Sequence, residues 1–374
     1  MRPKILFIMH VAPPVHGAAM VGKYIKESKV INDAFETDYI NLSTSEKLSE
    51  SGKAGILKLV RLGQIQLKVI ASLFKKDYDL CYVTLTASGP GFYKDIAIIL
   101  ILKLFRTKII YHFHNKGVDS AGKSYINNLL YKFVFHKVFS IILSECLYYD
   151  IAHYASAKNV FFCANGIPEN KLALNTGNSD LESRGVSRLL FLGNMMEEKG
   201  VFVLLKACKI LNEMSLPFEC HFVGSWADVL PTDFKNRITD YGLNNIVFTH
   251  GAKYDLDKQR FFVESDVFIF PSFYHYESFP LVVIEALQYQ LPVISCPEGG
   301  IADMVKDGVN GFLVPQRDEE VLADKIKILI EDPELRIRMG IAGRKRYETL
   351  FKLETFETSM KDILTEAILR SPGS

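Results

Sequence analysis

The stretch that decides the fold is Ser265–Pro315, which reads SDVFIFPSFYHYESFPLVVIEALQYQLPVISCPEGGIADMVKDGVNGFLVP. The apolar run Val267–Phe270 predicts a buried strand that ends at Pro271. A loop then leads to a helix that starts near Pro280, where a proline loses no needed donor. Strands that are apolar along their whole length and separated by helices are typical of a parallel sheet covered on both faces.

The same alternation of strand and helix extends over the rest of the chain, in two sets separated by a polar stretch at 175–187. The expected strands are Lys4–Val11, Thr37–Leu42, Leu80–Leu85, Lys108–Phe113, Val138–Ile142 and Val160–Phe162, then Arg188–Gly193, Phe218–Val223, Asn245–Thr249, Asp266–Phe270, Pro292–Ser295 and Gly311–Val314. A charged amphipathic helix, about Glu334–Leu369, is expected to close the chain. The pattern predicts two doubly wound, Rossmann-like α/β domains facing a central cleft.

The composition is that of a globular protein. Of 374 residues, 48% are hydrophobic and 23% charged, which excludes disordered, collagen-like and coiled-coil chains. The six cysteines are scattered without CxxC spacing, which favours a reducing cytosol and argues against a disulfide framework or a zinc site. No signal peptide is expected, and the longest apolar run, Ile96–Phe105, is too short for a membrane span.

The net charge of +1 divides unevenly along the chain. Residues 1–164 hold 21 Lys and Arg against 12 Asp and Glu, a net charge of +9, and the remaining residues have a net charge of −8. The asymmetry favours two domains with different partners, the first of which faces something anionic. The alternative is a drift of surface charge without function.

Two glutamates, Glu277 and Glu285, flank the start of the helix that follows the decisive strand. In doubly wound sheets ligands bind beyond the carboxyl ends of the strands, and the free N–H groups of a helix start favour a phosphate there. One carboxylate could hold sugar hydroxyls and the other a ribose diol. The alternative is a pair of solvated side chains.

Three further loops carry candidate residues. In Phe191–Gly200, Gly193 is expected to allow a sharp turn and Lys199 to lie at the positive end of a helix, where it would hold a diphosphate. Gly17 follows the first strand, outside any GxGxxG fingerprint, which weakens a nicotinamide or flavin hypothesis. His112 and His114 end another strand on one face. The alternatives are a surface lysine and a structural histidine.

These residues together resemble those of the GT-B-fold glycosyltransferases of the group 1, or family 4, type. The likeness rests on the block Glu277–Ala286, the loop ending at Lys199-Gly200, the turn Gly299-Gly300 and the segment Asn310–Val314. It implies residues 1–164 as an acceptor-binding domain, 165–350 as a nucleotide-sugar domain, and 351–374 as a helix that crosses back to the first domain.

The resemblance also implies a role for each candidate. Glu277 would contact donor-sugar hydroxyls, Glu285 the ribose, and Lys199 the leaving diphosphate. Backbone N–H groups around Ser278, Phe279 and Leu281 would assist Lys199, His114 would lie beside the transferred sugar, and Gly17 near the diphosphate. Two departures stand out. Asn194 replaces the usual Arg, so one cationic contact to the diphosphate is either missing or supplied from elsewhere, with Lys253 and Arg260 as candidates. Pro280 stands where the family often has Gly, which removes one potential N–H donor.

The function implied is transfer of a hexose from a nucleotide-diphosphate sugar, UDP favoured over GDP, to a glycan or lipid-linked acceptor with retention of configuration. The setting implied is bacterial surface polysaccharide synthesis in the cytoplasm, at the inner face of the plasma membrane. The resemblance also implies no cofactor and no obligatory metal, and the sequence is in line with this, since no convincing Asp-x-Asp ends a strand. The alternatives are a GT-B nucleotide-sugar epimerase and a non-catalytic nucleotide-sugar binding protein.

One helix of the first half, Gly55–Lys75, has a basic side that carries Lys58, Arg61, Lys68 and Lys75. Its other side carries Val60, Leu67 and Phe74, among other apolar residues. The basic side predicts contact with an anionic membrane near a lipid-diphosphate acceptor. The alternative is a solvated face over a buried one. Nucleic-acid binding is not expected, because the basic residues lack interleaved aromatic residues around a known motif.

Overall fold

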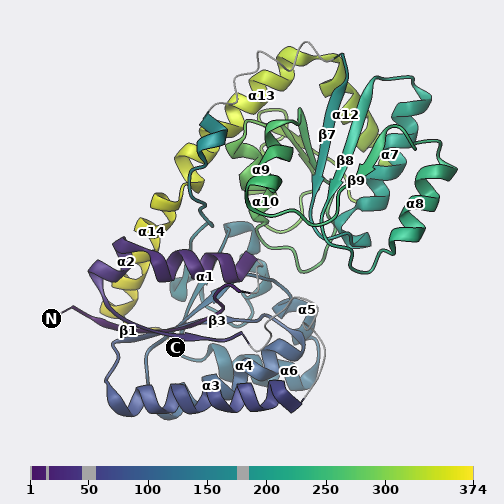
Figure 1. The fold of residues 1–374 in the computed structure, drawn as a ribbon. Helices are drawn as coiled ribbons and strands as arrows, with labels where there is room; N and C mark the ends of the chain where they lie inside the picture. Colours follow the sequence, from purple (N-terminus) through teal and green to yellow (C-terminus); the bar gives the residue numbers. More distant parts are fainter. Residues whose placement is uncertain (1, 14–16, 44–55, 175–184, 374) are drawn as a thin grey trace. The chain divides into compact units, whose positions relative to one another are not determined.

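The computed structural model describes residues 2–13, 17–43, 56–174 and 185–373. The chain divides into two compact units, Met1–Gly166 together with Leu353–Ser374, and Ile167–Lys352 (Figure 1). The sequence analysis placed the boundaries after residues 164 and 350, and the structure places them after 166 and 352. Most of the polar stretch 175–187 lies outside the described residues.

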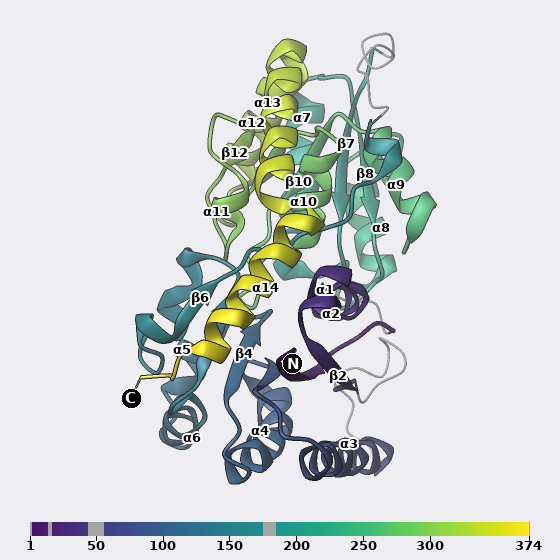
Figure 2. The same ribbon diagram turned by 90° about the vertical axis from the view of Figure 1, so that its left-hand side faces the viewer.

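The first unit is built on a parallel sheet in the order β2-β1-β3-β4-β5-β6. Its strands are β1 Lys4–Met9, β2 Glu36–Asn41, β3 Leu80–Leu85, β4 Ile109–Phe113, β5 Phe139–Ile142 and β6 Val160–Phe162. Helices α1 (Gly17–Glu27), α2 (Lys29–Ala34) and α14 (Leu353–Leu369) cover one face, and α3 (Ile56–Lys75), α4 (Gly89–Leu104) and α6 (Tyr125–Phe135) cover the other (Figures 1 and 2). Because both faces are covered, the inner strands β3, β4 and β5 are buried along their whole length.

The C-terminal segment is an integral part of this unit. Helix α14 buries Phe356, Met360, Leu364 and Ala367. The Lys108 ammonium donates to the carbonyls of Ile368 and Arg370, at 2.5 and 2.8 Å. The side chain of Asn159 exchanges two 3.0 Å hydrogen bonds with the backbone of Gly373. The first unit is therefore completed by residues that follow the second unit in sequence.

The second unit has its own parallel sheet, in the order β12-β11-β10-β7-β8-β9. Its strands are β7 Ser187–Leu192, β8 Phe218–Val223, β9 Val247–Thr249, β10 Val267–Phe270, β11 Val293–Ser295 and β12 Gly311–Leu313. Its helices are α7 Val201–Glu213, α8 Pro231–Asp240, α9 Asp255–Val263, α10 Leu281–Gln288, α11 Ile301–Met304, α12 Glu319–Glu331 and α13 Pro333–Arg346. All twelve predicted strands are present in the two sheets, with ends shifted by at most two residues.

The predicted single helix at 334–369 is wrong. Helix α13 ends at Arg346, a turn of π-helix follows at Tyr347–Phe351, and Lys352 is extended before α14 begins. The break occurs because the chain entering the unit lies against it. Ile167 forms a β-bridge with Lys352, and the Ile167 N–H donates to the Phe351 carbonyl at 3.0 Å. A distant segment thus takes the backbone groups that a continuous helix would have used.

The described residues include no helix with the length and apolar character that crossing a membrane requires.

Candidate active site

The candidate site lies at the point where the strand order of the second sheet reverses. Strands β7 and β10 are adjacent and parallel there, although two strands, β8 and β9, separate them in sequence order. In doubly wound sheets ligands bind at this switch point, beyond the carboxyl ends of the strands. The loop after β7 carries Lys199, and the loop after β10 carries Glu277. The two loops that the sequence analysis singled out therefore start at neighbouring strand ends.

Lys199 and Glu277 form an ion pair that is largely shielded from water, with side chains 15% and 11% exposed. The Lys199 ammonium also lies 4.8 Å from the centre of the Tyr274 ring and 5.2 Å from that of Phe270. The Ser272 hydroxyl donates to the same Glu277 oxygen at 3.5 Å. The cation is thus held between one carboxylate and two aromatic faces, at the place where a ligand is expected.

The turn that leads to Lys199 depends on Gly200 and not on Gly193, which corrects the sequence expectation. Gly200 has a φ of +82°, and a Cβ on it would lie 2.2 Å from the Pro271 carbonyl oxygen. Gly193 has no such φ, and a Cβ there would meet only ordinary contacts, the nearest at 3.4 Å. Gly200 is therefore the residue that lets the β7 loop approach the β10 loop, where the Phe273 N–H donates to the Glu198 carbonyl at 2.8 Å.

The loop that follows β11 is the third loop that packs against Glu277. Gly299 has a φ of +58°, and a Cβ on it would lie 2.4 Å from the Glu277 carbonyl oxygen. The Gly300 N–H donates to the Ser278 carbonyl at 2.6 Å. Glu277, Ser278 and Phe279 are buried between these loops. The backbone of the Glu277 loop is thus fixed from two sides, which holds its carboxylate in place.

Helix α10 begins at Leu281, directly after Pro280, which caps it without a side-chain hydrogen bond. The first N–H groups of an α-helix have no partner within the helix and favour an anion in front of them. The N–H groups of Leu281 and Val282 occupy these positions. Two groups of positive charge are therefore available near Glu277. One is the ammonium of Lys199, which precedes Glu277 in the sequence, and the other is the N-terminus of α10, which follows it.

Glu285, in the second turn of α10, binds a cation that the sequence analysis did not name. Its Oε1 lies 2.5 Å from the ammonium of Lys258 on α9. Its Oε2 is buried, and so is the Tyr289 hydroxyl; neither has a hydrogen-bond partner within the described chain. Burial, assisted by the charge of Glu285, raises the pKa of Tyr289. Asn194 is exposed.

Gly17 and His114 belong to the first unit. Gly17 is the exposed first residue of α1, and no atom lies within 4 Å of where its Cβ would be. His114 follows β4, and its ring centre lies 4.1 Å from that of His112, which confirms that both face the same side. His112 is fully buried, and its Nδ1 lies 2.5 Å from the Tyr82 hydroxyl. Burial, with a smaller contribution from His114, holds the pKa of His112 well below its usual value.

The loop after His114 is anchored by Asp150, which the sequence analysis missed. The buried Asp150 carboxylate accepts hydrogen bonds of 2.9–3.1 Å from the N–H groups of Gly117, Val118 and Asp119. A carboxylate that receives three backbone N–H groups fixes their backbone strongly. Asp150 therefore fixes the backbone of the residues that follow His114.

No cluster of three or more His, Cys, Asp or Glu side chains suited to a metal ion occurs among residues 2–13, 17–43, 56–174 and 185–373.

The pair of doubly wound sheets, with charged residues at a switch point, is the architecture of the GT-B glycosyltransferases. Residues 181–346 match the family described as glycosyl transferases group 1. The family is one of retaining hexosyltransferases.

Curated relatives share less than a third of their residues with the chain. The capsular polysaccharide biosynthesis glycosyltransferase CapM of Staphylococcus aureus is 29% identical over 220 residues, 57% of this chain and 56% of its own. The O-antigen chain mannosyltransferase C of Escherichia coli is 30% identical over 171 residues, 46% and 44% of the two chains. The chain spans about half the length of the curated relatives that it matches.

Solved structures with the same fold cover nearly the whole chain. Anabaena Alr3699/HepE, solved in complex with UDP, superposes with a TM-score of 0.74 over 97% of this chain and 100% of its own, at 18% identity. The lipopolysaccharide outer core galactosyltransferase WaaB, solved in its apo form, gives a TM-score of 0.73 over 97% and 99%, at 14% identity. At these identities the similarity establishes the fold.

Proposed function

We propose that the chain is a retaining glycosyltransferase that transfers a hexose from UDP-sugar to a glycan or lipid-linked acceptor in bacterial surface polysaccharide synthesis, in the cytoplasm. The observation that carries the proposal is the shielded Lys199–Glu277 pair at the switch point of the second sheet. The family match over residues 181–346 supports it. The relatives named for capsular polysaccharide and O-antigen synthesis support the biological setting.

In this proposal Lys199 stabilises the diphosphate as it leaves. The bond from the anomeric carbon to the diphosphate oxygen breaks, and negative charge grows on that oxygen. A fixed ammonium group and the first N–H groups of α10 oppose this charge, which is the electrostatic effect that usually contributes most to catalysis. The N–H groups around Ser278, Phe279 and Leu281 are the donors proposed for this role.

Glu277 accepts hydrogen bonds from hydroxyl groups of the donor sugar. Lys199 and Ser272 occupy one of its oxygens, so the other can accept. The acceptor hydroxyl forms the new bond to the anomeric carbon on the face that the nucleotide leaves, which retains the configuration. Its proton passes to a diphosphate oxygen, so no side chain has to act as a strong base.

Glu285 holds the ribose of the nucleotide. Its Oε2 is the buried oxygen without a protein partner, and a ribose hydroxyl would satisfy it. We assign UDP over GDP, in line with the UDP complex of the structural neighbour. Gly193 and Asn194 lie in the β7 loop and complete the proposed donor-binding set. In the first unit, His114 is assigned to the transferred sugar and Gly17 to the diphosphate.

Transfer measured with Lys199→Ala tests this proposal. Release of UDP from UDP-glucose, with acceptor-containing membranes, should fall by about 10²–10³-fold, as expected for the loss of one preorganised charge stabiliser. Lys209→Ala is the matched control, because Lys209 is an exposed residue of α7 that pairs with Glu213 and lies over the Tyr241 ring, away from Glu277. A thermal shift with UDP but not GDP should accompany activity in the unaltered protein.

Three outcomes would contradict the assignment. Near-normal transfer by Lys199→Ala would show that the Lys199–Glu277 ion pair is not needed for sugar transfer. Release of a free epimerised nucleotide sugar without acceptor would indicate an epimerase instead. Nucleotide-sugar binding without transfer or epimerisation, over a panel of acceptors, would indicate a binding protein. Full activity in the presence of a chelator is expected, since no metal is assigned to the reaction.

A further inference from the structure

Exposed apolar side chains gather on one layer of the first unit. Phe74 and Leu104 are each 79% exposed, Tyr125 is 77% exposed and Leu67 is 68% exposed. They lie on or directly beside α3, α4 and α6, the three helices that cover one face of the sheet side by side (Figures 1 and 2). Single exposed apolar residues are normal, but a contiguous set marks a docking surface.

The layer is continuous from α3 to α6. The rings of Phe74 and Phe105 meet edge to face at 5.1 Å, which joins the end of α3 to the end of α4. The Tyr93 hydroxyl of α4 donates to the Asn127 side chain of α6 at 2.6 Å. We call this surface the α3–α4–α6 face. Its exposed apolar residues are Val60, Leu67, Phe74, Tyr93, Leu100, Leu104, Phe105, Tyr125, Ile126, Leu129 and Phe133.

Helix α3 has two apolar stripes, which corrects the expectation that Val60, Leu67 and Phe74 form a buried side. The buried residues are Ile65, Val69 and Leu73. These follow the four-residue spacing of a helix face packed on the rest of the unit. Val60, Leu67 and Phe74, seven residues apart, are all more than half exposed. The sequence pattern could not distinguish the two stripes, because both have helical periodicity.

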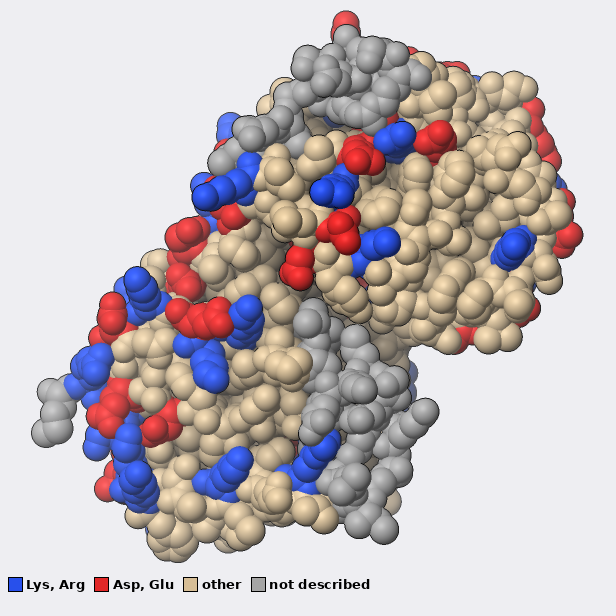
Figure 3. Space-filling view, viewed as in Figure 1, with Lys and Arg blue, Asp and Glu red and all other residues tan. Residues whose placement is uncertain are grey.

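The charge on this face is mainly positive, and the exposed Asp77, just past the end of α3, is an exception. Each exposed residue of the α3 stripe is followed directly by a base, and further bases lie on α4 and α6 or next to their ends: Arg61, Lys68, Lys75, Lys103, Arg106, Lys132 and Lys137. The described parts of the three helices contain a single acid, Asp95, which is fully buried. Along the edge formed by α3, Figure 3 shows basic side chains set in uncharged surface.

We propose that the α3–α4–α6 face docks on the anionic headgroup surface of a lipid bilayer. Exposed aliphatic and aromatic residues interleaved with bases are what such a surface recognises, because the apolar groups enter the headgroup boundary while the ammonium groups meet lipid phosphates. Tyr93 and Tyr125 suit this boundary, since an amphipathic ring has both surroundings there. Lys58, also predicted to take part, lies on α3, but its side chain is outside the described residues.

Sedimentation with vesicles tests the proposal on the full chain. Vesicles of phosphatidylcholine with phosphatidylglycerol should bind the protein, and vesicles of phosphatidylcholine alone should bind it much more weakly. Lys68→Gln with Lys75→Gln should weaken binding by about 25-fold, at about fivefold for each cation removed from the surface. Raising the salt concentration should have a similar effect, because screening shortens the reach of these charges.

The apolar contribution is tested separately by Leu67→Glu, with Leu256→Glu as the matched control. Leu256 is also an exposed helical leucine, 63% exposed, but it lies on α9 of the second unit. Leu67→Glu should lower binding by at least about tenfold, and Leu256→Glu should leave it unchanged. Both positions are exposed, so both variants should keep the thermal midpoint of the unaltered protein.

Several results would overturn the proposal: no binding to anionic vesicles, binding that salt does not weaken, or equal losses for Leu67→Glu and Leu256→Glu. A dimer in solution that Leu67→Glu dissociates, without vesicle binding, would assign the face to a second copy of the chain. Because UDP binding is expected from the second unit, a thermal shift with UDP in the Leu67→Glu variant separates failure of this proposal from failure of the proposed function.

Discussion

Gly200 lies where the loop after β7 packs against the loop after β10 in the candidate site. A side chain there would be strained twice, because its φ is +82° and because the Cβ would lie 2.2 Å from the Pro271 carbonyl. Gly242 has a φ of +70° with no atom within 4 Å of its Cβ position, so it isolates the first effect. We expect Gly242→Ala to cost about 1–2 kcal/mol of unfolding free energy. Gly200→Ala should cost about 1–3 kcal/mol more, because the Pro271 backbone must move.

Chemical denaturation, followed through the aromatic residues of the second unit, measures both variants. Gly200→Ala should also weaken the thermal shift with UDP, because it displaces the loop that carries Lys199, whereas Gly242→Ala should not. Equal unfolding free energies for the two variants would contradict a role for the close approach.

His112 makes the stability of the first unit depend on pH. Because its pKa is far below the usual value in the folded state, the unfolded chain binds one more proton below about pH 6.5. The stability that neutral His112 supports is therefore present above this pH and is lost as the pH falls, by up to about 1.4 kcal/mol per pH unit. Hydrogen exchange of the β4 amides at pH 7 and below measures it, with rates corrected for intrinsic pH dependence. His112→Gln should flatten the pH dependence, and an unchanged slope would assign it to other groups.

For single residues, the sequence indicates which residues are candidates for the site better than it indicates which residues they contact. Lys199, Glu277 and Glu285 could be predicted because each lies at a fixed position after a strand or within a helix turn. Lys258 could not, because it reaches Glu285 from another helix, 27 residues earlier in the chain. Gly193 was assigned the turn because both glycines fit the pattern, and only backbone geometry separates it from Gly200.

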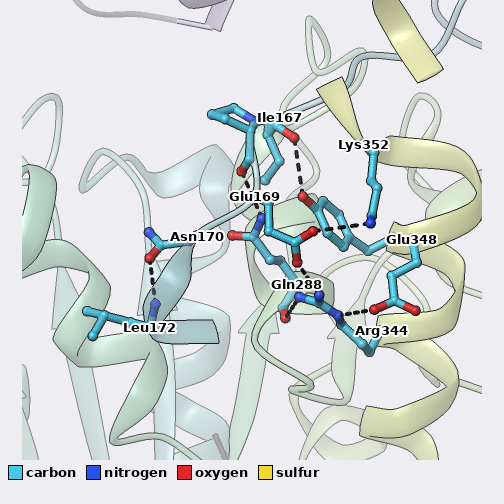
Figure 4. Close-up of polar contacts among 10 residues, drawn as sticks. Ile167, Glu169, Asn170, Leu172, Gln288, Arg344, Glu348 and Lys352 are labelled. Atoms are coloured by element: carbon cyan, nitrogen blue, oxygen red, sulfur yellow. Dashed lines mark hydrogen bonds and ion pairs between the residues drawn. The ribbon is translucent and has the colours of Figure 1, made fainter. Parts of the chain in front are cut away.

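Among the elements, α13 is tied to the segment that enters the second unit (Figure 4). The Arg344 guanidinium binds Glu169 and Glu348, and it donates to the Gln288 carbonyl at 2.9 Å. Lys352 reaches the same Glu169 at 3.1 Å. One arginine thus joins the segments at which the chain enters and leaves the unit, and its planar fork suits this better than a lysine would.

Arg344→Ala should lower the unfolding free energy of the second unit by about 1–3 kcal/mol, because it removes charge-assisted hydrogen bonds to Glu169 and Glu348 and the bond to the Gln288 carbonyl. Arg344→Lys should recover only a small part. Arg338→Ala is the control, since Arg338 of the same helix makes an exposed pair with Glu334 and should cost less than about 1 kcal/mol. Thermal unfolding compares the three variants, and equal effects of Arg344→Ala and Arg338→Ala would contradict the role of the network.

Whether a segment forms a strand or a helix could be predicted from the sequence wherever the pattern of buried apolar residues determines it. The strands are short apolar runs, and their positions follow directly from them. The end of α13 could not be predicted, because residues 347–351 retain a helical pattern and the break comes from pairing with Ile167. The exposed stripe of α3 was missed for the related reason that periodicity does not say which side meets the sheet.

For the molecule as a whole, the charge asymmetry persists when the units are taken as the structure divides them. With Leu353–Ser374 assigned to the first unit, that unit has 23 Lys and Arg against 16 Asp and Glu, a net charge of +7, and the second unit has a net charge of −6. The basic unit is also the one that carries the α3–α4–α6 face. The asymmetry thus coincides with a proposed anionic partner, as expected if surface charge follows function.

The discontinuous first unit leads to a prediction about fragments. Residues 167–352 form one unit from continuous chain, with Lys199, Glu277 and Glu285 inside it. Expressed alone, this fragment should fold and show a thermal shift with UDP. Residues 1–166 lack α14, which buries Phe356, Met360 and Leu364. At about 1.5–3 kcal/mol for each large apolar side chain, their loss is comparable to the whole stability of a domain.

The fragment 1–166 should therefore be unfolded or melt without cooperativity, and a peptide of residues 353–374 added in trans should restore a cooperative transition. A peptide in which Met360 and Leu364 are replaced by Glu is the control and should fail, because these side chains are buried in the unit. Circular dichroism measures both. Cooperative unfolding of 1–166 without the peptide would show that α14 is an addition to a complete domain. Rescue by the peptide would show that the first unit is incomplete until residues 353–374, which follow the second unit in sequence, have joined it.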